Sequence, residues 1–171
     1  MKHNDALSFL QKAQIEKDKP QRWLDLGCGS GTFTNALAAL LAAGSEIVAV
    51  DKAPQQFKPN ITHSPVHFLQ ADFTTELLPV AGVDGIFMSN ALHYVADQKP
   101  FIQRIETYFA KQKQFLIVEY DREKANQWVP FPLSFERLRR LFSSLGYFNI
   151  QKLNERPSAY GQGNMYLAHI Q

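Results

Sequence analysis

The chain of 171 residues has the size of one domain, and its 45% hydrophobic content suits a folded core rather than a disordered chain. Eighteen basic and sixteen acidic residues give a net charge of +2, and the basic residues are scattered. This balance argues against a nucleic-acid-binding protein. Arg137, Arg139 and Arg140 form the only tight basic group, which we interpret as the solvated face of a helix.

The single cysteine and the length of the apolar runs set the expected cellular environment. Cys28 has no partner for an internal disulfide, and the first residues lead into no long apolar signal region. The longest apolar run, residues 36–44, is shorter than the roughly 20 residues that cross a bilayer. We therefore expect a cytoplasmic protein that has no contact with the membrane.

Helix and strand patterns alternate along the chain, which is typical of a parallel sheet with helices on both faces. A helix over 5–17 opens a single domain over 1–171, in which 1–20 form the leading helix and linker. The later expected elements are strand 22–26, helix 32–43, strands 46–50, 66–70 and 83–88, helix 97–111, strand 114–119, a helix from Ser134 to Gly146, and strands 147–153 and 164–170. The last two strands suit a hairpin at the sheet edge. The expected fold is a doubly wound, Rossmann-like, seven-stranded α/β sheet, mostly parallel with one antiparallel edge strand.

A glycine-rich turn joins the first strand to the helix that follows it. In Asp25-Leu26-Gly27-Cys28-Gly29-Ser30-Gly31 the glycines alternate, so the backbone can turn sharply and a ligand can approach without meeting a Cβ atom. Asp51 ends the second strand, where a carboxylate can accept both hydroxyl protons of a ribose. A dinucleotide fingerprint would place its third glycine at position 32, which is Thr32. The pattern therefore predicts a nucleoside cofactor other than a dinucleotide.

The turn resembles motif I of the class I S-adenosylmethionine-dependent methyltransferases. Residues 48–51 and 70–73 look like the second and third motifs of that family, and 84–94 resembles the fourth-strand motif of its small-molecule branch. Tyr94 stands where that branch often has a second histidine. The resemblance covers nearly the whole chain from Arg22 onward and implies S-adenosylmethionine as the cofactor.

The resemblance also implies a set of cofactor-binding residues. Asp51 would bind the ribose, Asp72 would accept a hydrogen bond from the adenine amino group, and the backbone at Phe73 would meet the adenine ring. Gly27 and Asn90 would flank the methionine end. The implied set is Asp25, Gly27, Cys28, Gly29, Gly31, Asp51, Lys52, Asp72, Phe73 and Asn90. Cys28 is interpreted as a small loop residue rather than a nucleophile.

His93 is the candidate catalytic residue. Methyl transfer from a sulfonium leaves a neutral thioether, so a protein contributes mainly orientation and exclusion of water. A base is needed only when the acceptor must lose a proton, and His93 follows the fourth strand close to the expected methyl group. The alternative role for His93 is to shape the loop behind the cofactor.

Loop aromatics are the candidate acceptor-binding residues. Tyr94, Trp128, Phe131 and Tyr160 fall in loops expected at the carboxyl ends of the strands or in the closing hairpin. Ordinary packing is the alternative role for each. Metal assistance is not expected, because beyond Glu119 and Asp121 no cluster of acids follows the fourth and fifth strands.

The expected function is methyl transfer to a small-molecule acceptor that the motifs do not identify. The alternatives are a methyltransferase acting on RNA or protein and a cofactor-binding module without catalysis. The fourth strand lacks the Asn/Asp-Pro-Pro-Tyr signature of enzymes that methylate adenine or glutamine nitrogens. Tyr120 and Lys124 have the spacing of the short-chain dehydrogenase pair, but Tyr120 closes a strand rather than lying on a helix, which argues against that class.

Overall fold

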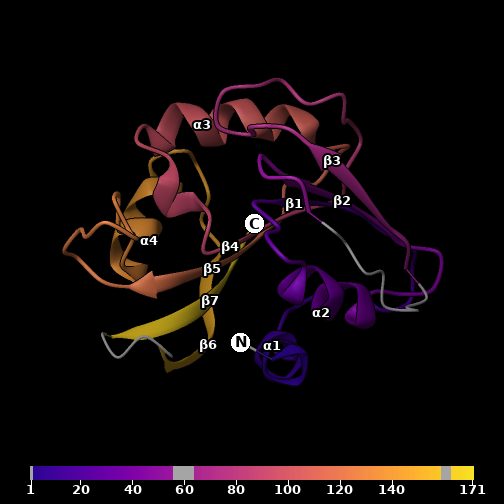
Figure 1. The fold of residues 1–171 in the computed structure, drawn as a ribbon, viewed down its shortest axis with the longest axis horizontal. Helices are drawn as coiled ribbons and strands as arrows, with labels where there is room; N and C mark the ends of the chain where they lie inside the picture. The colour runs from indigo at the N-terminus through magenta and orange to yellow at the C-terminus, as the bar shows by residue number, and fades with distance from the viewer. Residues whose placement is uncertain (1, 56–63, 159–162) are drawn as a thin grey trace.

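The computed structural model describes residues 2–55, 64–158 and 163–171. Its centre is a seven-stranded sheet of strand order β3-β2-β1-β4-β5-β7-β6 (Figure 1). The elements in chain order are α1 (His3–Leu10), β1 (Arg22–Leu26), α2 (Thr32–Leu40), β2 (Glu46–Asp51), β3 (Val66–Gln70), β4 (Gly85–Ser89), the 3₁₀ turn η1 (Leu92–Tyr94), α3 (Gln98–Ile105), the 3₁₀ turn η2 (Glu106–Tyr108), β5 (Phe115–Asp121), α4 (Phe135–Ser143), β6 (Ile150–Pro157) and β7 (Asn164–Ile170).

The first five strands are parallel, and the antiparallel pairing lies at one edge, which confirms the predicted sheet class. Strand β7 is antiparallel to both of its neighbours, β5 and β6, so β6 is the outermost strand. Six of the seven residues of β7 are buried, whereas those of β6 are mostly exposed or half-buried. The apolar strand therefore takes the inner position and the polar strand takes the edge.

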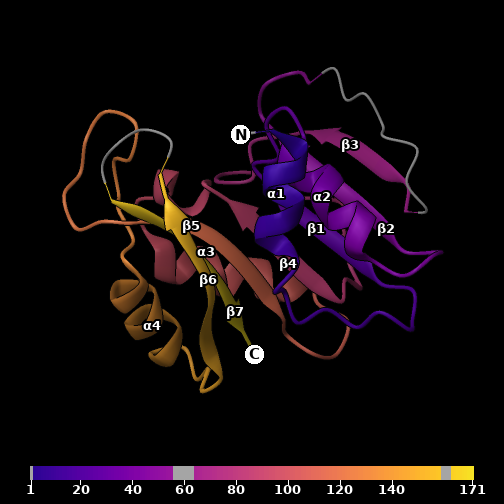
Figure 2. The ribbon, with the colours of Figure 1, turned by 90° about the horizontal axis from the view of Figure 1, so that it is seen from below.

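Helices cover both faces of the sheet, as the alternation of patterns predicts. Helices α1 and α2 lie on one face, where Phe9 and Leu37 pack with Trp23 and Phe87. Helices α3 and α4 lie on the other face, where their apolar side chains join Ile86 and other residues in a second core (Figures 1 and 2). The two cores hold the sheet rigid between them.

The bounds of several helices and strands differ from the predicted ones. Helix α1 ends at Leu10 rather than at 17, although Ala13 and Ile15 beyond it are buried. Helix α2 ends at Leu40, because Leu41 is extended, and the 97–111 segment divides into α3 and η2. Strand β6 starts at Ile150 and continues into the predicted loop as far as Pro157. Burial of apolar side chains does not require helical backbone, so the apolar pattern overestimates helix length.

Gly85 lies where β4 passes the buried indole of Trp23. A Cβ atom at position 85 would come within 2.5 Å of that ring. We expect Gly85→Ala to lower the free energy of unfolding by about 1–3 kcal/mol, because the packed indole has no space to move into. Chemical denaturation measures the effect.

Gly146→Ala is the matched control. That position has a φ of +93° and no atom within 4 Å of its Cβ, so only local backbone strain of about 1 kcal/mol is expected. Equal losses in the two variants would contradict the packing argument.

Candidate active site

The glycine turn between β1 and α2 is fixed from two sides. The backbone N–H groups of Gly27 and Cys28 both donate to the carbonyl oxygen of Val50, at 2.8 and 3.0 Å. Gly27 has a φ of +81°, and a Cβ atom there would lie 2.5 Å from Cβ of Ala91. Gly31 begins α2 with a φ of +78°. The turn therefore brings bare backbone to the point where the chain order of the sheet reverses, between β1 and β4.

Asp51, at the end of β2, faces this turn. Its Oδ2 accepts a hydrogen bond from the N–H of Gly29 at 2.9 Å, and its Oδ1 accepts one from the N–H of Ala53 at 2.9 Å. Each carboxylate oxygen has more than one acceptor site. Asp51 is therefore held in one orientation and can still bind hydroxyl groups of a ligand.

Asp25 is a buried carboxyl group beneath the turn. Its Oδ2 accepts a hydrogen bond from the Thr34 hydroxyl at 2.6 Å, while its Oδ1 is buried without a partner among the described residues. Burial raises the pKa of Asp25 from its usual 3.8 to about 7. A positively charged ligand in the adjoining cavity would favour the ionised form.

The raised pKa of Asp25 predicts a pH-dependent stability. Between pH 4 and pH 7 the folded chain binds a proton at Asp25 that the unfolded chain does not, so its free energy of unfolding falls as pH rises through this range. Relative to Asp25→Asn, we expect the original chain to lose about 2–4 kcal/mol between pH 4 and 7.5. Denaturant titrations of both proteins without ligand measure this difference. Parallel pH profiles for the two proteins would contradict it.

A cavity of about 440 Å³ opens in front of the glycine turn. It brings together six of the ten predicted cofactor residues: Asp25, Gly27, Cys28, Gly29, Asp51 and Asn90. Its lining also includes residues that the sequence analysis did not select: Asp5, Ser30, Thr32, Phe33, Ser89, Arg156, Pro157, Ser158 and Met165. Several of these come from α1 and the β6–β7 hairpin, which are distant in sequence from the glycine motif.

The other four predicted cofactor residues lie outside the lining of this cavity. Gly31 contributes backbone to the start of α2, and Lys52 follows Asp51 as an exposed residue. The carboxylate of Asp72 accepts from the N–H of Thr74 at 2.9 Å, and the Thr74 hydroxyl bond holds the pKa of Asp72 below its usual value. Phe73 is buried against Phe101 below the turn.

Asn90 follows β4 in an unusual backbone conformation. Its φ of +51° is in the left-handed region, which non-glycine residues other than Asn and Asp rarely adopt. Its Oδ1 is buried without a hydrogen-bond partner among the described residues. Asn90 lines the first cavity and also a second one beside it. The residue therefore lies at the junction of two spaces.

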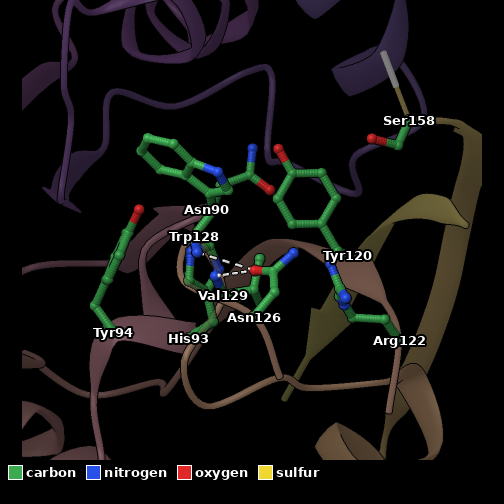
Figure 3. Close-up of a pocket in the computed structure, with 9 residues that line it drawn as sticks. All are labelled: Asn90, His93, Tyr94, Tyr120, Arg122, Asn126, Trp128, Val129 and Ser158. Carbon is green, nitrogen blue, oxygen red and sulfur yellow. Dashed lines mark hydrogen bonds between the residues drawn. The ribbon is translucent and has the colours of Figure 1, made fainter. Parts of the chain in front are cut away.

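The second cavity has a volume of about 660 Å³. Figure 3 shows Tyr94 and Tyr120 on opposite sides of it, with the indole of Trp128 between them. The Asn126 side chain accepts from the N–H groups of Trp128 and Val129, at 3.0 and 2.7 Å, and so fixes the turn that presents the indole. The nine lining residues are Asn90, His93, Tyr94, Tyr120, Arg122, Asn126, Trp128, Val129 and Ser158.

Three of the five predicted catalytic and acceptor residues line this cavity: His93, Tyr94 and Trp128. Phe131 does not. It lies in a separate groove with its neighbours Pro130 and Pro132, and its backbone N–H donates to the carbonyl oxygen of His93 at 3.0 Å. Tyr160 lies outside the described residues.

A buried glutamate, Glu119 of β5, holds His93 in place. The Oε2 of Glu119 lies 2.7 Å from Nδ1 of His93, and its Oε1 accepts from the His93 backbone N–H at 3.1 Å. Both side chains are buried. With an ionised Glu119, Nδ1 carries the proton, which leaves Nε2 as the proton acceptor. The hydrogen bond of the His93 ring to Glu119 is made at Nδ1, and the ring lines the second cavity.

Sequence reasoning missed Glu119 as a site residue, although a signal for it was present. Glu119 follows four apolar residues of β5, and an acid in a strand buried on both faces requires a partner. Tyr120 lies near the end of the same strand, and Arg122 and Asn126 follow it, at the sheet edge where parallel α/β folds bind ligands. Ser158 carried no comparable signal, because it reaches the cavity through the β6–β7 hairpin.

Cys28 lies in the first cavity as a protonated thiol. Burial, together with the nearby carboxylates of Asp25 and Asp51, raises its pKa. The nucleophile in thiol chemistry is the thiolate, so this environment favours the predicted role of a small loop residue.

Among the described residues, no three His, Cys, Asp or Glu side chains are grouped so that they could hold a metal ion. No helix in that part of the chain is long and apolar enough to span a membrane.

The parallel sheet, the glycine turn after β1 and the carboxylate that ends β2 define an α/β protein of the nucleotide-cofactor-binding class. Residues 17–163 match the methyltransferase domain family. The chain therefore belongs to the class I S-adenosylmethionine-dependent methyltransferases.

Two curated relatives match part of the chain. An uncharacterised methyltransferase of Mycobacterium tuberculosis is 33% identical over 85 residues, which cover 48% of this chain and 42% of the relative. A ubiquinone biosynthesis O-methyltransferase of Parvibaculum lavamentivorans is 32% identical over 87 residues, which cover 48% of this chain and 33% of the relative. The matches thus span less than half the length of each curated relative.

Solved structures share the fold over nearly the whole chain. A methyltransferase of Leishmania major has a TM-score of 0.72 at 17% identity and covers 99% of this chain and 72% of its own. The 1,6-didemethyltoxoflavin-N1-methyltransferase of Burkholderia thailandensis has a TM-score of 0.71 at 17% identity. The match covers 98% of this chain and 76% of that enzyme, which was solved with 1,6-didemethyltoxoflavin and S-adenosylhomocysteine. At this identity the likeness shows the fold alone.

Proposed function

We propose that this chain transfers a methyl group from S-adenosylmethionine to a small-molecule acceptor. The observation that carries the proposal is the pair of adjoining cavities, which share Asn90, Tyr94, Tyr120 and Ser158. One cavity contains the glycine turn and Asp51, and the other contains His93. A methyl donor and its acceptor require this arrangement, because the transferred carbon must be in contact with both.

The residues of the first cavity fit the cofactor. Backbone at Gly29, where a Cβ atom would meet nothing within 4 Å, leaves space for it, and Asp51 is oriented to accept its ribose hydroxyls. The buried Oδ1 atoms of Asp25 and Asn90, which accept no hydrogen bond from the described residues, suit the cationic methionine end. The edge formed by Lys52, Asp72 and Phe73 is proposed for the adenine. When bound, S-adenosylmethionine supplies a methyl group activated by the positive charge on sulfur.

His93 is proposed as the base for an acceptor that must lose a proton. Nε2 of His93 takes the proton of an acceptor hydroxyl as the acceptor oxygen bonds to the methyl carbon. Bound S-adenosylmethionine would supply the methyl carbon and keep the bonding electron pair on sulfur, so the balance would be a methyl ether, a neutral thioether and a protonated imidazole at His93. Glu119 stabilises that imidazolium through Nδ1 and is therefore a positioning residue.

The size and composition of the second cavity favour a small acceptor. About 660 Å³ is within the range of small-molecule sites, and three of its nine lining residues, Tyr94, Tyr120 and Trp128, are large aromatic residues. The net charge of +2 gives little support for an RNA acceptor. The Burkholderia thailandensis neighbour, solved with 1,6-didemethyltoxoflavin, is consistent with a small-molecule acceptor. A cytoplasmic location stays a prediction from the sequence.

Transfer of radiolabelled methyl groups tests the proposed function. The purified chain would be incubated with methyl-labelled S-adenosylmethionine and separate small-molecule, RNA and protein fractions. We expect label in the small-molecule fraction and none with Asp51→Ala. Label in RNA or protein alone would favour a macromolecular acceptor, and binding of the cofactor without transfer to any fraction would favour a non-catalytic module.

A further inference from the structure

Arg122 is the one permanently charged residue among the described residues that line the second cavity. Its Nε donates to the carbonyl oxygen of Lys124 at 2.8 Å, which orients the guanidinium group. No described carboxylate forms an ion pair with it, because Glu119 is bound to His93 and Asp121 to Lys152. The terminal nitrogens of Arg122 therefore keep their donor capacity for a ligand.

The walls beside Arg122 suit a planar ring. Tyr94, Tyr120 and Trp128 come from three separate stretches of chain and surround the same space, with Arg122 on the Tyr120 side (Figure 3). Trp128 is exposed, yet the Asn126 side chain fixes the backbone that carries it. A large aromatic side chain held on a rigid turn but not packed into a core is available for stacking on a ligand.

These features, together with the proposed function on which this inference rests, lead to a class of acceptor. We propose that the acceptor is an aromatic carboxylate with a hydroxyl group, whose carboxylate pairs with Arg122 while the ring lies among Tyr94, Tyr120 and Trp128. A guanidinium group matches a carboxylate through two parallel hydrogen bonds. One arginine neutralises a carboxylate, whereas a doubly charged phosphate would need further cations. The hydroxyl of the same ring then faces His93.

Matched ligands test the charge and the ring separately. The probes are a hydroxybenzoate series, the corresponding hydroxybenzamides, and cyclohexanecarboxylate as an anion without an aromatic ring. Each is titrated by NMR into the full chain saturated with S-adenosylhomocysteine. We expect the hydroxybenzoate that binds best to bind about tenfold more tightly than its amide, because a charged carboxylate forms stronger hydrogen bonds with a guanidinium group than a neutral amide does. Cyclohexanecarboxylate should bind more weakly than that hydroxybenzoate.

Two Arg122 variants test whether Arg122 is the cause of the tighter binding of the acid than of the amide. Arg122→Gln should remove the difference between acid and amide without changing the affinity for S-adenosylhomocysteine, and Arg122→Lys should restore part of it. Trp128→Leu should weaken the binding of the hydroxybenzoate and of its amide by a similar factor. These results would assign the carboxylate to Arg122 and the ring to the aromatic wall.

The inference is overturned if acid and amide bind equally, if the preference survives Arg122→Gln, if the saturated alicyclic acid binds as well as the aromatic one, or if no hydroxybenzoate binds. Titration of S-adenosylhomocysteine into the same protein preparations before any ligand is added separates this inference from the proposed function. Loss of the acid preference with intact cofactor binding rejects only the acceptor class, whereas absence of cofactor binding rejects the proposed function itself.

Discussion

We expect His93→Ala to reduce the rate of methyl transfer by about a hundredfold or more while leaving the affinity for S-adenosylhomocysteine unchanged. The reason is the arrangement around the imidazole. Glu119 occupies Nδ1 at 2.7 Å, so Nε2 is the atom available to take a proton from the acceptor. Turnover and cofactor binding, measured on the same preparations, check the expectation.

The pH dependence of this loss separates a base from a residue that shapes the loop. If His93 takes the proton, the defect of His93→Ala should shrink as pH rises to the range where the acceptor hydroxyl ionises unaided. A constant defect across pH, or a loss below about tenfold, would instead assign His93 to loop structure. Its carbonyl contact with the N–H of Phe131 provides a physical basis for that alternative.

Glu119→Gln changes the other member of the His93–Glu119 pair. Glutamine keeps the shape of the side chain but can offer an N–H to Nδ1, which would place the imidazole proton on Nε2. We expect a loss of turnover comparable to that of His93→Ala, with the same response to pH. Wild-type rates in Glu119→Gln would show that the tautomer of His93 has no part in the reaction.

The second large effect is expected at Asp51. Asp51→Ala should weaken S-adenosylhomocysteine binding by about a hundredfold or more, because hydrogen bonds to a charged carboxylate contribute about 1.5–3 kcal/mol each and two ribose hydroxyls are involved. The change also releases the N–H groups of Gly29 and Ala53, so the turn loses its anchor. Isothermal titration calorimetry measures the affinity.

Asp18→Ala is the control for Asp51→Ala, since it removes an exposed acid outside the cofactor cavity. It should leave the affinity unchanged. A reduction of less than about threefold in Asp51→Ala, or an equal effect in both variants, would remove Asp51 from the binding site.

The strand ranges and the antiparallel hairpin at one edge of the sheet were predictable from the sequence, because buried parallel strands are short apolar runs. Strands β1 and β3 match the predicted ranges. Ser134, where the predicted helix begins, is the N-cap of α4, and its side chain accepts from the N–H of Arg137. The placement of β7 between β5 and β6 was not predicted. The order of the two hairpin strands depends on which of them is apolar on both faces. The hydrophobic pattern of each strand taken alone does not give this comparison.

The two halves of the site differ in how far the sequence predicts them. Most of the residues around the glycine turn lie within a short local motif, so Asp25, Gly27, Gly29 and Asp51 meet where expected. The proposed acceptor half is built from loops after β4 and β5 and from the hairpin, and its shape depends on tertiary packing. This is why Trp128 lines the cavity while Phe131, three residues later in the same loop, lies in a separate groove.

Calorimetric titration of the purified chain with S-adenosylmethionine and S-adenosylhomocysteine tests whether the cavity at Gly27 and Asp51 binds this cofactor. We expect one site per chain with affinity in the micromolar range for both compounds, competition between them, and loss of the signal in Asp51→Ala. A chain that is folded by circular dichroism and binds neither compound would contradict the assignment of the cavity at Gly27 and Asp51 to this cofactor.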